Sequence, residues 1–176
     1  MSAWRFFLRF IEKPSSVGAV KPSSRALVRA MLAPIDWSRV GVVAEFGPGT
    51  GVMTRGILKR MAPQARLVAY EVDPLFARKL LNIADQRLHV RNVGAQQLDV
   101  GVDAIISSLP LNALPASVSH AVLSNAAKRL KPGGLFVQFQ YTTMQERLLK
   151  RYFAVEKRRF VLWNLPPAFV YVCRKN

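Results

Sequence analysis

The chain has few acidic residues, one cysteine and no long apolar run. It contains 10 aspartates and glutamates against 26 lysines and arginines, which gives 176 residues a net charge of +16. The single cysteine excludes an intrachain disulfide framework and a zinc site built from several cysteines. No run of side chains approaches the roughly 18 apolar residues that a transmembrane helix needs. We therefore expect a protein of a reducing, cytoplasmic compartment.

The positive charge is concentrated at the two ends of the chain. Residues 1–39 carry seven basic and two acidic side chains, and residues 147–176 carry eight and one. The residues between these flanks are nearly balanced. A basic excess attracts polyanions, and charge alone does not choose between nucleic acid and the anionic face of a membrane.

The middle of the chain alternates between short apolar runs, which predict strands, and stretches of helical periodicity. The expected strands cover residues 42–46, 67–71, 88–93, 102–108, 135–139, 158–163 and 168–173. The expected helices cover residues 51–62, 74–84, 115–130 and 143–152. Strands that alternate with helices of this length favour an α/β fold, with a mostly parallel sheet covered on both faces.

The last two expected strands have no helix between them. They are therefore predicted to form a hairpin, which places one antiparallel strand in an otherwise parallel sheet. Hydrophobic residues make up 51% of the chain, enough to bury the core of one domain and too many for a disordered chain. We expect that domain over residues 36–176, after an N-terminal extension over residues 1–35.

The start of the extension has the pattern of an amphipathic helix. Apolar side chains recur three and four residues apart on one face: Trp4, Phe7, Leu8 and Ile11. Charged side chains occupy the other side: Arg5, Arg9, Glu12 and Lys13. A basic helix with aromatic residues on its apolar face is typical of a bilayer interface. The alternative is a helix that packs on the core of its own domain.

A glycine-rich loop over residues 47–51 joins the first expected strand, which ends in Glu45 and Phe46, to the first expected helix. Glycines let the backbone approach a ligand, and the following helix offers free N–H groups. Glu71 ends the second strand, where a carboxylate accepts both hydroxyls of a ribose. The spacing is G-x-G-x-G, which differs from a dinucleotide loop, and the lysine of a triphosphate-binding loop is missing. The alternative is a loop that only turns a strand into a helix.

Residues 40–140 resemble the class I S-adenosylmethionine-dependent methyltransferases. Three features carry the resemblance: the loop of residues 45–51, the acidic end of strand two and the Lys-Pro-Gly-Gly turn at 131–134. The resemblance implies a Rossmann-like fold whose seven-stranded sheet has a reversed last strand. It also implies S-adenosylmethionine as cofactor and S-adenosylhomocysteine as product. Glu45 and the loop then hold the methionine end, and Glu71 holds the ribose. The implied cofactor-binding residues are Glu45, Gly47, Pro48, Gly49, Thr50, Gly51, Glu71, Val72, Ala95 and Ser107.

The adenine end of the expected cofactor site departs from that family. Many of its members place an aspartate after the third strand to hold the adenine amine, whereas residues 92–95 contain no carboxylate. Asn92, a backbone amide near Ala95, and Gln96 are the alternatives for this role.

A closer resemblance, on residues 17–24, 108–111, 136–141 and 163–168, is to the bacterial phospholipid N-methyltransferases. It implies methylation of the amine of phosphatidylethanolamine toward phosphatidylcholine. That family has an alanine where this chain has Lys21. The residues expected to bind the lipid phosphate are Lys21, Ser23, Ser24 and Arg25. The residues expected at the reacting amine are Tyr141, Ser108, Leu109 and Asn164.

Some of these acceptor residues also have a structural interpretation. The proline and serines at residues 22–24 are equally suited to cap a helix that begins at Arg25. Tyr141 is equally suited to packing against its neighbours, and Asn164 to the turn before two prolines. These alternatives stay open at the level of sequence.

A second function class is nucleic-acid adenine N6-methylation. Those enzymes place Asn or Asp, a proline and an aromatic residue after the fourth strand, whereas residues 108–111 keep only the proline. The asparagine and prolines at 164–167 follow the wrong strand. A cofactor-binding module without catalysis is a third class.

The expected partners are an anionic membrane surface and its phospholipid, reached through the N-terminal helix, which would act as a lid. Nucleic acid is the less favoured partner. No metal is expected. The expected location is the cytoplasm, peripheral on the inner face of the cytoplasmic membrane.

Overall fold

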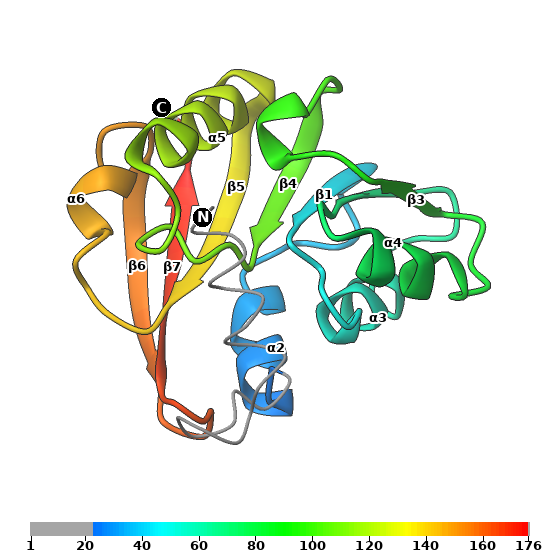
Figure 1. Cartoon of the computed structure of the whole chain (residues 1–176), viewed down its shortest axis with the longest axis horizontal. Helices are drawn as coiled ribbons and strands as arrows, with labels where there is room; N and C mark the ends of the chain where they lie inside the picture. The colour runs from blue at the N-terminus through cyan, green and yellow to red at the C-terminus, as the bar shows by residue number, and fades with distance from the viewer. Residues whose placement is uncertain (1–22, 176) are drawn as a thin grey trace.

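Seven strands form one sheet in residues 23–175, the part of the chain that this computed structural model describes (Figure 1). The strand order is β3-β2-β1-β4-β5-β7-β6. The bounds are β1 (Val42–Phe46), β2 (Arg66–Tyr70), β3 (Leu88–Arg91), β4 (Val102–Ser107), β5 (Leu130–Gln140), β6 (Ala154–Val161) and β7 (Ala168–Arg174). β7 is antiparallel to both of its neighbours, and all other pairs are parallel. The predicted reversed last strand is confirmed.

The helices lie between the strands as the periodicity predicts, with two changes at the ends of the domain. Their bounds are α2 (Arg25–Leu32), α3 (Val52–Leu58), α4 (Pro74–Leu81), η1 (Ala95–Gln97), α5 (Ala116–Arg129) and α6 (Glu146–Leu149). The helix expected over residues 143–152 is a single turn, because the backbone after Leu149 closes tighter bonds, from Arg151 N–H to Leu148 O and from Tyr152 N–H to Leu149 O. β6 consequently starts four residues earlier than expected.

Helix α2 is part of the packed domain, although its residues fall in the expected N-terminal extension. Leu27, Met31 and Leu32 on one side of the helix are completely buried, while Arg25 and Arg29 on the other side are exposed. The expected helix near residues 4–13 lies outside the described residues, and so does Lys21. No helix within residues 23–175 is long and apolar enough to cross a membrane.

Two apolar cores cover the two faces of the sheet. On one face, α2 and α3 pack against inward side chains of the central strands, including Val43, Ala104 and Val137. On the other face, α5 and residues 149–153 pack against side chains that include Phe136, which stacks on Phe153 with ring centroids 4.7 Å apart. Burial of both faces explains why the strands are nearly continuous apolar runs.

The strand order reverses at β1 and β4, and in open α/β sheets the carboxyl ends of such a strand pair are the position of a ligand-binding crevice. The chain goes outward from β1 to β2 and β3 and then returns to β4 on the other side of β1. Ligands of open α/β sheets bind outside the carboxyl ends of the strands, where the strand order reverses. The arrowheads of β4, β5 and β6 point toward this same edge, and that of β7 points away (Figure 1).

Candidate cofactor and acceptor site

The glycine-rich loop lies at this crevice, in a conformation that requires glycine. Gly47, Gly49 and Gly51 all have positive φ, at 68°, 54° and 78°, a region that other residues rarely adopt. A Cβ at Gly47 would also come within 2.9 Å of the Leu109 side chain. A Cβ at Gly49 would meet no atom of residues 23–175 within 4 Å.

Glu71 is tied to the loop at the end of β2. Its Oε2 accepts from Gly49 N–H at 2.9 Å, and its Oε1 accepts from Asp73 N–H at 2.9 Å. Only 2% of the residue is exposed, and this burial raises the pKa of its carboxyl group. Each carboxylate oxygen accepts two hydrogen bonds, so one acceptor position on each is left for hydroxyls.

Glu45 is the second buried carboxyl group at this edge. It is completely buried near the end of β1, where its Oε2 accepts from the Thr54 hydroxyl at 2.7 Å. Its Oε1 has no hydrogen-bond partner among the described residues. Burial, with a contribution from the charge of Glu71, raises the pKa of Glu45 to about 8. Sequence reasoning missed Thr54, whose only signal is its place three residues inside the helix that follows the loop.

The remaining expected cofactor residues lie along the same edge. Pro48 and Ser107 are buried, Val72 is exposed, and Thr50 is exposed with its carbonyl accepting from Arg55. Ala95 is buried at the start of η1. The side chain of Asn125 on α5 supports η1 by donating to the carbonyls of Gln96 and Leu98, at 3.0 and 2.8 Å.

The side chain of Asn92 contacts the backbone of Glu71, the residue expected to hold the ribose. Its side-chain amide donates to the carbonyl of Glu71 at 2.7 Å. This bond uses one donor of the Asn92 amide; Asn92 and Gln96 are both exposed, and the three alternatives for the adenine stay open.

The loop after β4 is held by two glutamines of the 136–141 segment, to which the sequence analysis gave no individual role. Gln138 and Gln140, on β5, both donate to the carbonyl of Leu109 at 3.0 Å, and both are buried. A carbonyl oxygen has two lone pairs, so these bonds use its accepting capacity. The Leu109 carbonyl therefore anchors the loop, and the expected role of Ser108 and Leu109 at the acceptor amine stays a prediction. The available signal was two polar residues two positions apart in an apolar strand.

Ser108 and Tyr141 lie at the same edge of the sheet, each directly after one of two neighbouring strands. Ser108 follows β4, where its N–H donates to Phe46 O at 2.9 Å, and Tyr141 follows β5. The Tyr141 ring packs edge-on against Phe139, with centroids 5.5 Å apart, and is 38% exposed. Burial raises the pKa of its hydroxyl, so it is a neutral phenol at physiological pH.

Ser24 and Asn164, 140 residues apart, meet at the acceptor side. The Asn164 Oδ1 accepts from Ser24 N–H at 3.1 Å, and its Nδ2 donates to Pro166 O at 2.7 Å. The Ser24 hydroxyl accepts from Leu27 N–H at 3.1 Å, which confirms its role as the cap of α2. The structure therefore shows Asn164 as a bridge between two segments, and its expected contact to the acceptor amine stays a prediction. Ser23 is half-buried beside Ser24, and Arg25 is exposed.

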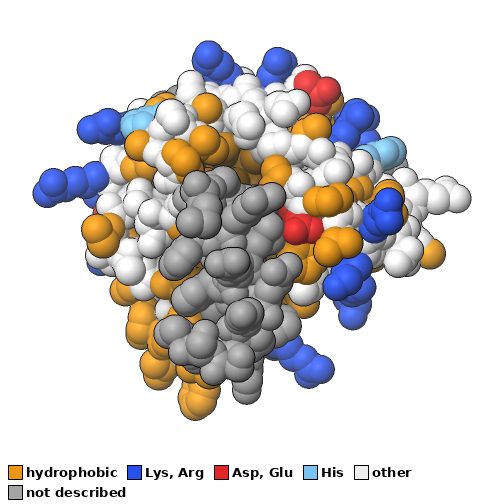
Figure 2. All heavy atoms as spheres, viewed as in Figure 1, with side chains coloured by type: hydrophobic (Ala, Val, Ile, Leu, Met, Phe, Trp, Pro, Cys, Tyr) orange, Lys and Arg blue, Asp and Glu red, His pale blue; other side chains and the backbone are white. Residues whose placement is uncertain are grey.

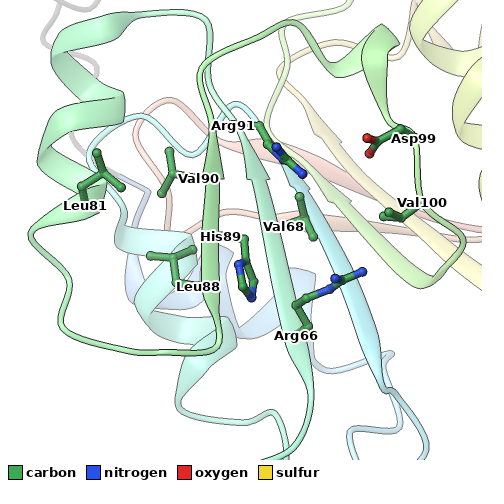
Figure 3. Close-up of a pocket in the computed structure, with 9 residues that line it drawn as sticks. All are labelled: Arg66, Val68, Leu81, Leu88, His89, Val90, Arg91, Asp99 and Val100. Atoms are coloured by element: carbon green, nitrogen blue, oxygen red, sulfur yellow. The ribbon is translucent and has the colours of Figure 1, made fainter.

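A separate open hollow of about 370 Å³ lies over β2 and β3, away from these residues (Figure 3). Arg66, His89 and Arg91 project from the two strands into it, and Asp99 flanks it from the loop after η1. It contains none of the expected site residues. Within the described residues, no group of three histidine, cysteine or acidic side chains is arranged to hold a metal ion.

The residues at the crevice fit S-adenosylmethionine. Two buried carboxyl groups lie near each other, one of them with an unpartnered oxygen, and this suits a ligand that carries positive charge and vicinal hydroxyls. Among the described residues, none comes near the side of Gly49 where such a ligand would approach the backbone.

Comparisons with known proteins point the same way. A family model described as a methyltransferase domain matches residues 44–136. The ornithine lipid N-methyltransferase of Singulisphaera acidiphila is 31% identical over 183 residues, which cover 96% of this chain and 95% of that protein. The ribosomal RNA small subunit methyltransferase A of Mycobacterium tuberculosis is 28% identical over 108 residues, which cover 54% of this chain and 33% of that protein.

A solved structure shares the fold over the full chain. The N-methyltransferase NodS from Bradyrhizobium japonicum, in complex with S-adenosyl-L-homocysteine, matches with a TM-score of 0.76, covering 99% of both chains at 13% identity. On the match to the domain, the full-length relative and the carboxylates of the glycine-loop crevice, this chain belongs to the S-adenosylmethionine-dependent methyltransferases and resembles their lipid N-methyltransferases.

Proposed function

We propose that the chain transfers a methyl group from S-adenosylmethionine to the amine of phosphatidylethanolamine, and to the partly methylated amines that follow, toward phosphatidylcholine. The observation that carries the proposal is the similarity to an ornithine lipid N-methyltransferase over nearly the whole of both chains. This similarity covers the segments that carry the expected acceptor residues as well as those of the cofactor site. Phosphatidylethanolamine and ornithine lipid share a primary amine on a membrane-anchored molecule.

The chemistry needs positioning more than acid or base catalysis. Bound S-adenosylmethionine supplies a methyl group on a positively charged sulfur, which an amine lone pair displaces in line. The acceptor nitrogen must arrive uncharged, and it becomes positive as its new bond forms. Tyr141 is a neutral phenol at this edge, so we assign it to hold the amine by its oxygen or by the face of its ring. Correct alignment of two reactants accounts for much of such a rate gain.

The lipid phosphate is assigned to the residues around the start of α2. Ser23 and the exposed Arg25 lie beside Ser24, and Asn164 links this segment to the β6–β7 connection. Hydroxyl and guanidinium groups suit a phosphate. Lys21, which lies outside the described residues, belongs to the same proposal.

We also propose that the enzyme works at the inner face of the cytoplasmic membrane. The support is the basic excess of the two flanks and the amphipathic pattern of residues 4–13. This N-terminal segment lies outside the described residues, so the proposal rests on its sequence.

Ribosomal RNA adenine methylation is the alternative, favoured by the partial similarity to a ribosomal RNA methyltransferase. Against it, residues 108–111 lack the asparagine or aspartate and the aromatic residue that those enzymes place after β4. Moreover, the Leu109 carbonyl in that loop is held by two glutamines.

A transfer assay separates these functions. The chain is incubated with S-adenosylmethionine labelled in its methyl group and one of three acceptors: vesicles of phosphatidylethanolamine and phosphatidylglycerol, vesicles with ornithine lipid, or structured ribosomal RNA. We expect label in phosphatidylethanolamine. Label in ornithine lipid alone would change the substrate and keep the class, and label in RNA alone would overturn the proposal.

Tyr141→Ala should lower transfer at least tenfold. Tyr141→Phe should lower it less if the ring holds the amine.

A further inference from the structure

The connection between β6 and β7, which we call the tip (residues 162–167), exposes its apolar side chains to solvent. Trp163 is 82% exposed, and Leu162 and Leu165 are 61% and 60% exposed. Figure 2 shows hydrophobic side chains gathered at the lower left of the molecule, where Figure 1 places this connection. Scattered exposed apolar residues are ordinary, but three large ones within four positions of one loop form a patch that indicates an interaction site.

The polarity of the tip is the reverse of an ordinary surface loop. Asn164, its polar member, is only 7% exposed, because its side chain bonds to Ser24 and Pro166. Val161 before the tip and Ala168 after it are buried in the core on the α2 side. The loop is therefore anchored through its polar residue and its two ends, and this anchoring holds the apolar residues outward.

The tip projects from the edge of the sheet that carries the reaction site. β6 is parallel to β4 and β5 through its antiparallel neighbour β7, so its carboxyl end lies at their carboxyl edge. Phe169 on β7 pairs with Gln140 on one side and with Phe160 on the other. Tyr141, which follows Gln140, is consequently at the base of the hairpin. A surface into which the tip inserts therefore lies close to Tyr141, one of the residues expected at the reacting amine.

Basic side chains lie farther from the end of the hairpin than the apolar side chains of the tip. Lys157 and Arg159 are exposed on β6, and Arg25 and Arg29 are exposed on α2, which packs beside β6. No acidic residue occurs between Lys157 and Ala168. At about 3.3 Å per residue, Arg159 lies roughly 7 Å along the strand from its end at Val161, where the tip begins. An apolar and aromatic end with cations set back from it is the arrangement found where proteins meet the headgroups of a bilayer.

Among partners that carry negative charge, these residues suit a lipid bilayer better than RNA. Leu162 and Leu165 offer neither a hydrogen bond nor a flat ring on which a base stacks. Both gain by leaving water for the boundary between headgroups and acyl chains.

We propose that the tip inserts into the interface of an anionic bilayer and so turns the acceptor site toward the lipid headgroups. This deepens the proposed function and rests on it. It differs from docking by the N-terminal segment alone, because the inserted element is a rigid part of the domain, joined to the site by β5, β6 and β7.

Tryptophan fluorescence tests the insertion directly, because the chain has three tryptophans in different places: Trp4, Trp37 and Trp163. In the full chain with Trp4→Phe and Trp37→Phe, we expect Trp163 emission to be quenched strongly by brominated lipids in phosphatidylglycerol vesicles. The matched reporter keeps only Trp37, whose indole N–H donates to Leu32 O at the opposite end of α2, and its emission should not change. Vesicle binding without quenching of Trp163 would overturn the proposal.

A second measurement separates this inference from the function it serves. Leu162→Ser combined with Leu165→Ser should weaken binding to phosphatidylglycerol vesicles at least tenfold and lower methylation of vesicle lipid equally. Binding of S-adenosylmethionine and methylation of a short-chain, water-soluble phosphatidylethanolamine should be retained. Leu81→Ser, which changes an equally exposed leucine on α4, should leave vesicle binding unchanged.

The outcomes are distinguishable. Normal vesicle binding by the tip variant overturns the insertion and leaves lipid methylation intact. Quenching of Trp163 without transfer to any lipid amine overturns the proposed substrate and leaves the insertion intact. A dimer in sedimentation that the tip variant dissociates would show that a second copy covers the patch, which also overturns the insertion.

Discussion

The two halves of the site are built in different ways. In the cofactor half, β1 to β4 with the glycine loop, the key bonds join residues near in sequence, such as Glu45 to Thr54 and Glu71 to Gly49. In the acceptor half, α2 with β5 to β7, the key bond joins Ser24 to Asn164, 140 residues away. The cofactor half also buries two carboxyl groups, Glu45 and Glu71. A local motif therefore suffices to build the first, and only the complete fold builds the second.

The largest effect that we expect concerns the buried acid of the cofactor half. Glu45 has a pKa of about 8 in the folded chain against an ordinary value of 4.5, so the folded state holds its proton more tightly than the unfolded state. The contribution of Glu45 to the free energy of unfolding is therefore most favourable below pH 4.5, and it falls as the pH rises toward 8. The loss is several kcal/mol, or about 10 °C in Tm.

Glu45→Gln should remove that dependence. Thermal melting of both proteins at intervals from pH 5 to pH 8.5 measures this dependence. As the pH rises, the Tm of the variant should increase relative to the Tm of the parent. Melting curves that stay parallel across this range would show that Glu45 is not protonated in the folded chain. Glu156→Gln, which changes an exposed carboxylate on β6, is the matched control and should follow the parent.

The next effect tests whether Glu71 holds the cofactor. Glu71→Ala should weaken S-adenosylmethionine binding about 100-fold, or roughly 3 kcal/mol, since it removes a charged acceptor and leaves the N–H groups of Gly49 and Asp73 without their partner. Calorimetric titration measures the affinity, and a melt confirms that the variant is folded. Unchanged affinity would place the cofactor elsewhere.

The smallest effect tests the long-range bond of the acceptor half. Asn164→Ala should lower kcat/KM for vesicle lipid about tenfold, or roughly 1.4 kcal/mol, because it frees the start of α2 from the tip. Binding of S-adenosylmethionine should change less than twofold.

The reverse pattern is expected for Asn125→Ala, which loosens η1 in the cofactor half. That variant should weaken S-adenosylmethionine binding more than it affects the lipid. If the two variants lowered both quantities equally, the halves would not be separable as described.

Most of the fold was predictable because apolar runs and helical periodicity are local signals. The reversed last strand followed from the missing helix between two strands. The end of α6 did not follow, because its apolar residues also fit a series of tighter turns, and packing of Phe153 on Phe136 is a tertiary contact. Helix α2 was assigned to the extension because nothing in its sequence shows which surface its apolar side meets.

The roles of individual polar residues divide in the same way. By itself the sequence determined the α/β class, the glycine loop and its partner Glu71, because a strand, a tight turn and a helix start lie within one short segment. Only the tertiary structure decided that the Leu109 carbonyl anchors its loop, that Asn164 bridges to Ser24 and that three apolar residues of the tip face solvent. A side chain reveals its type in the sequence, but its partner is set by segments that folding brings together from far along the chain.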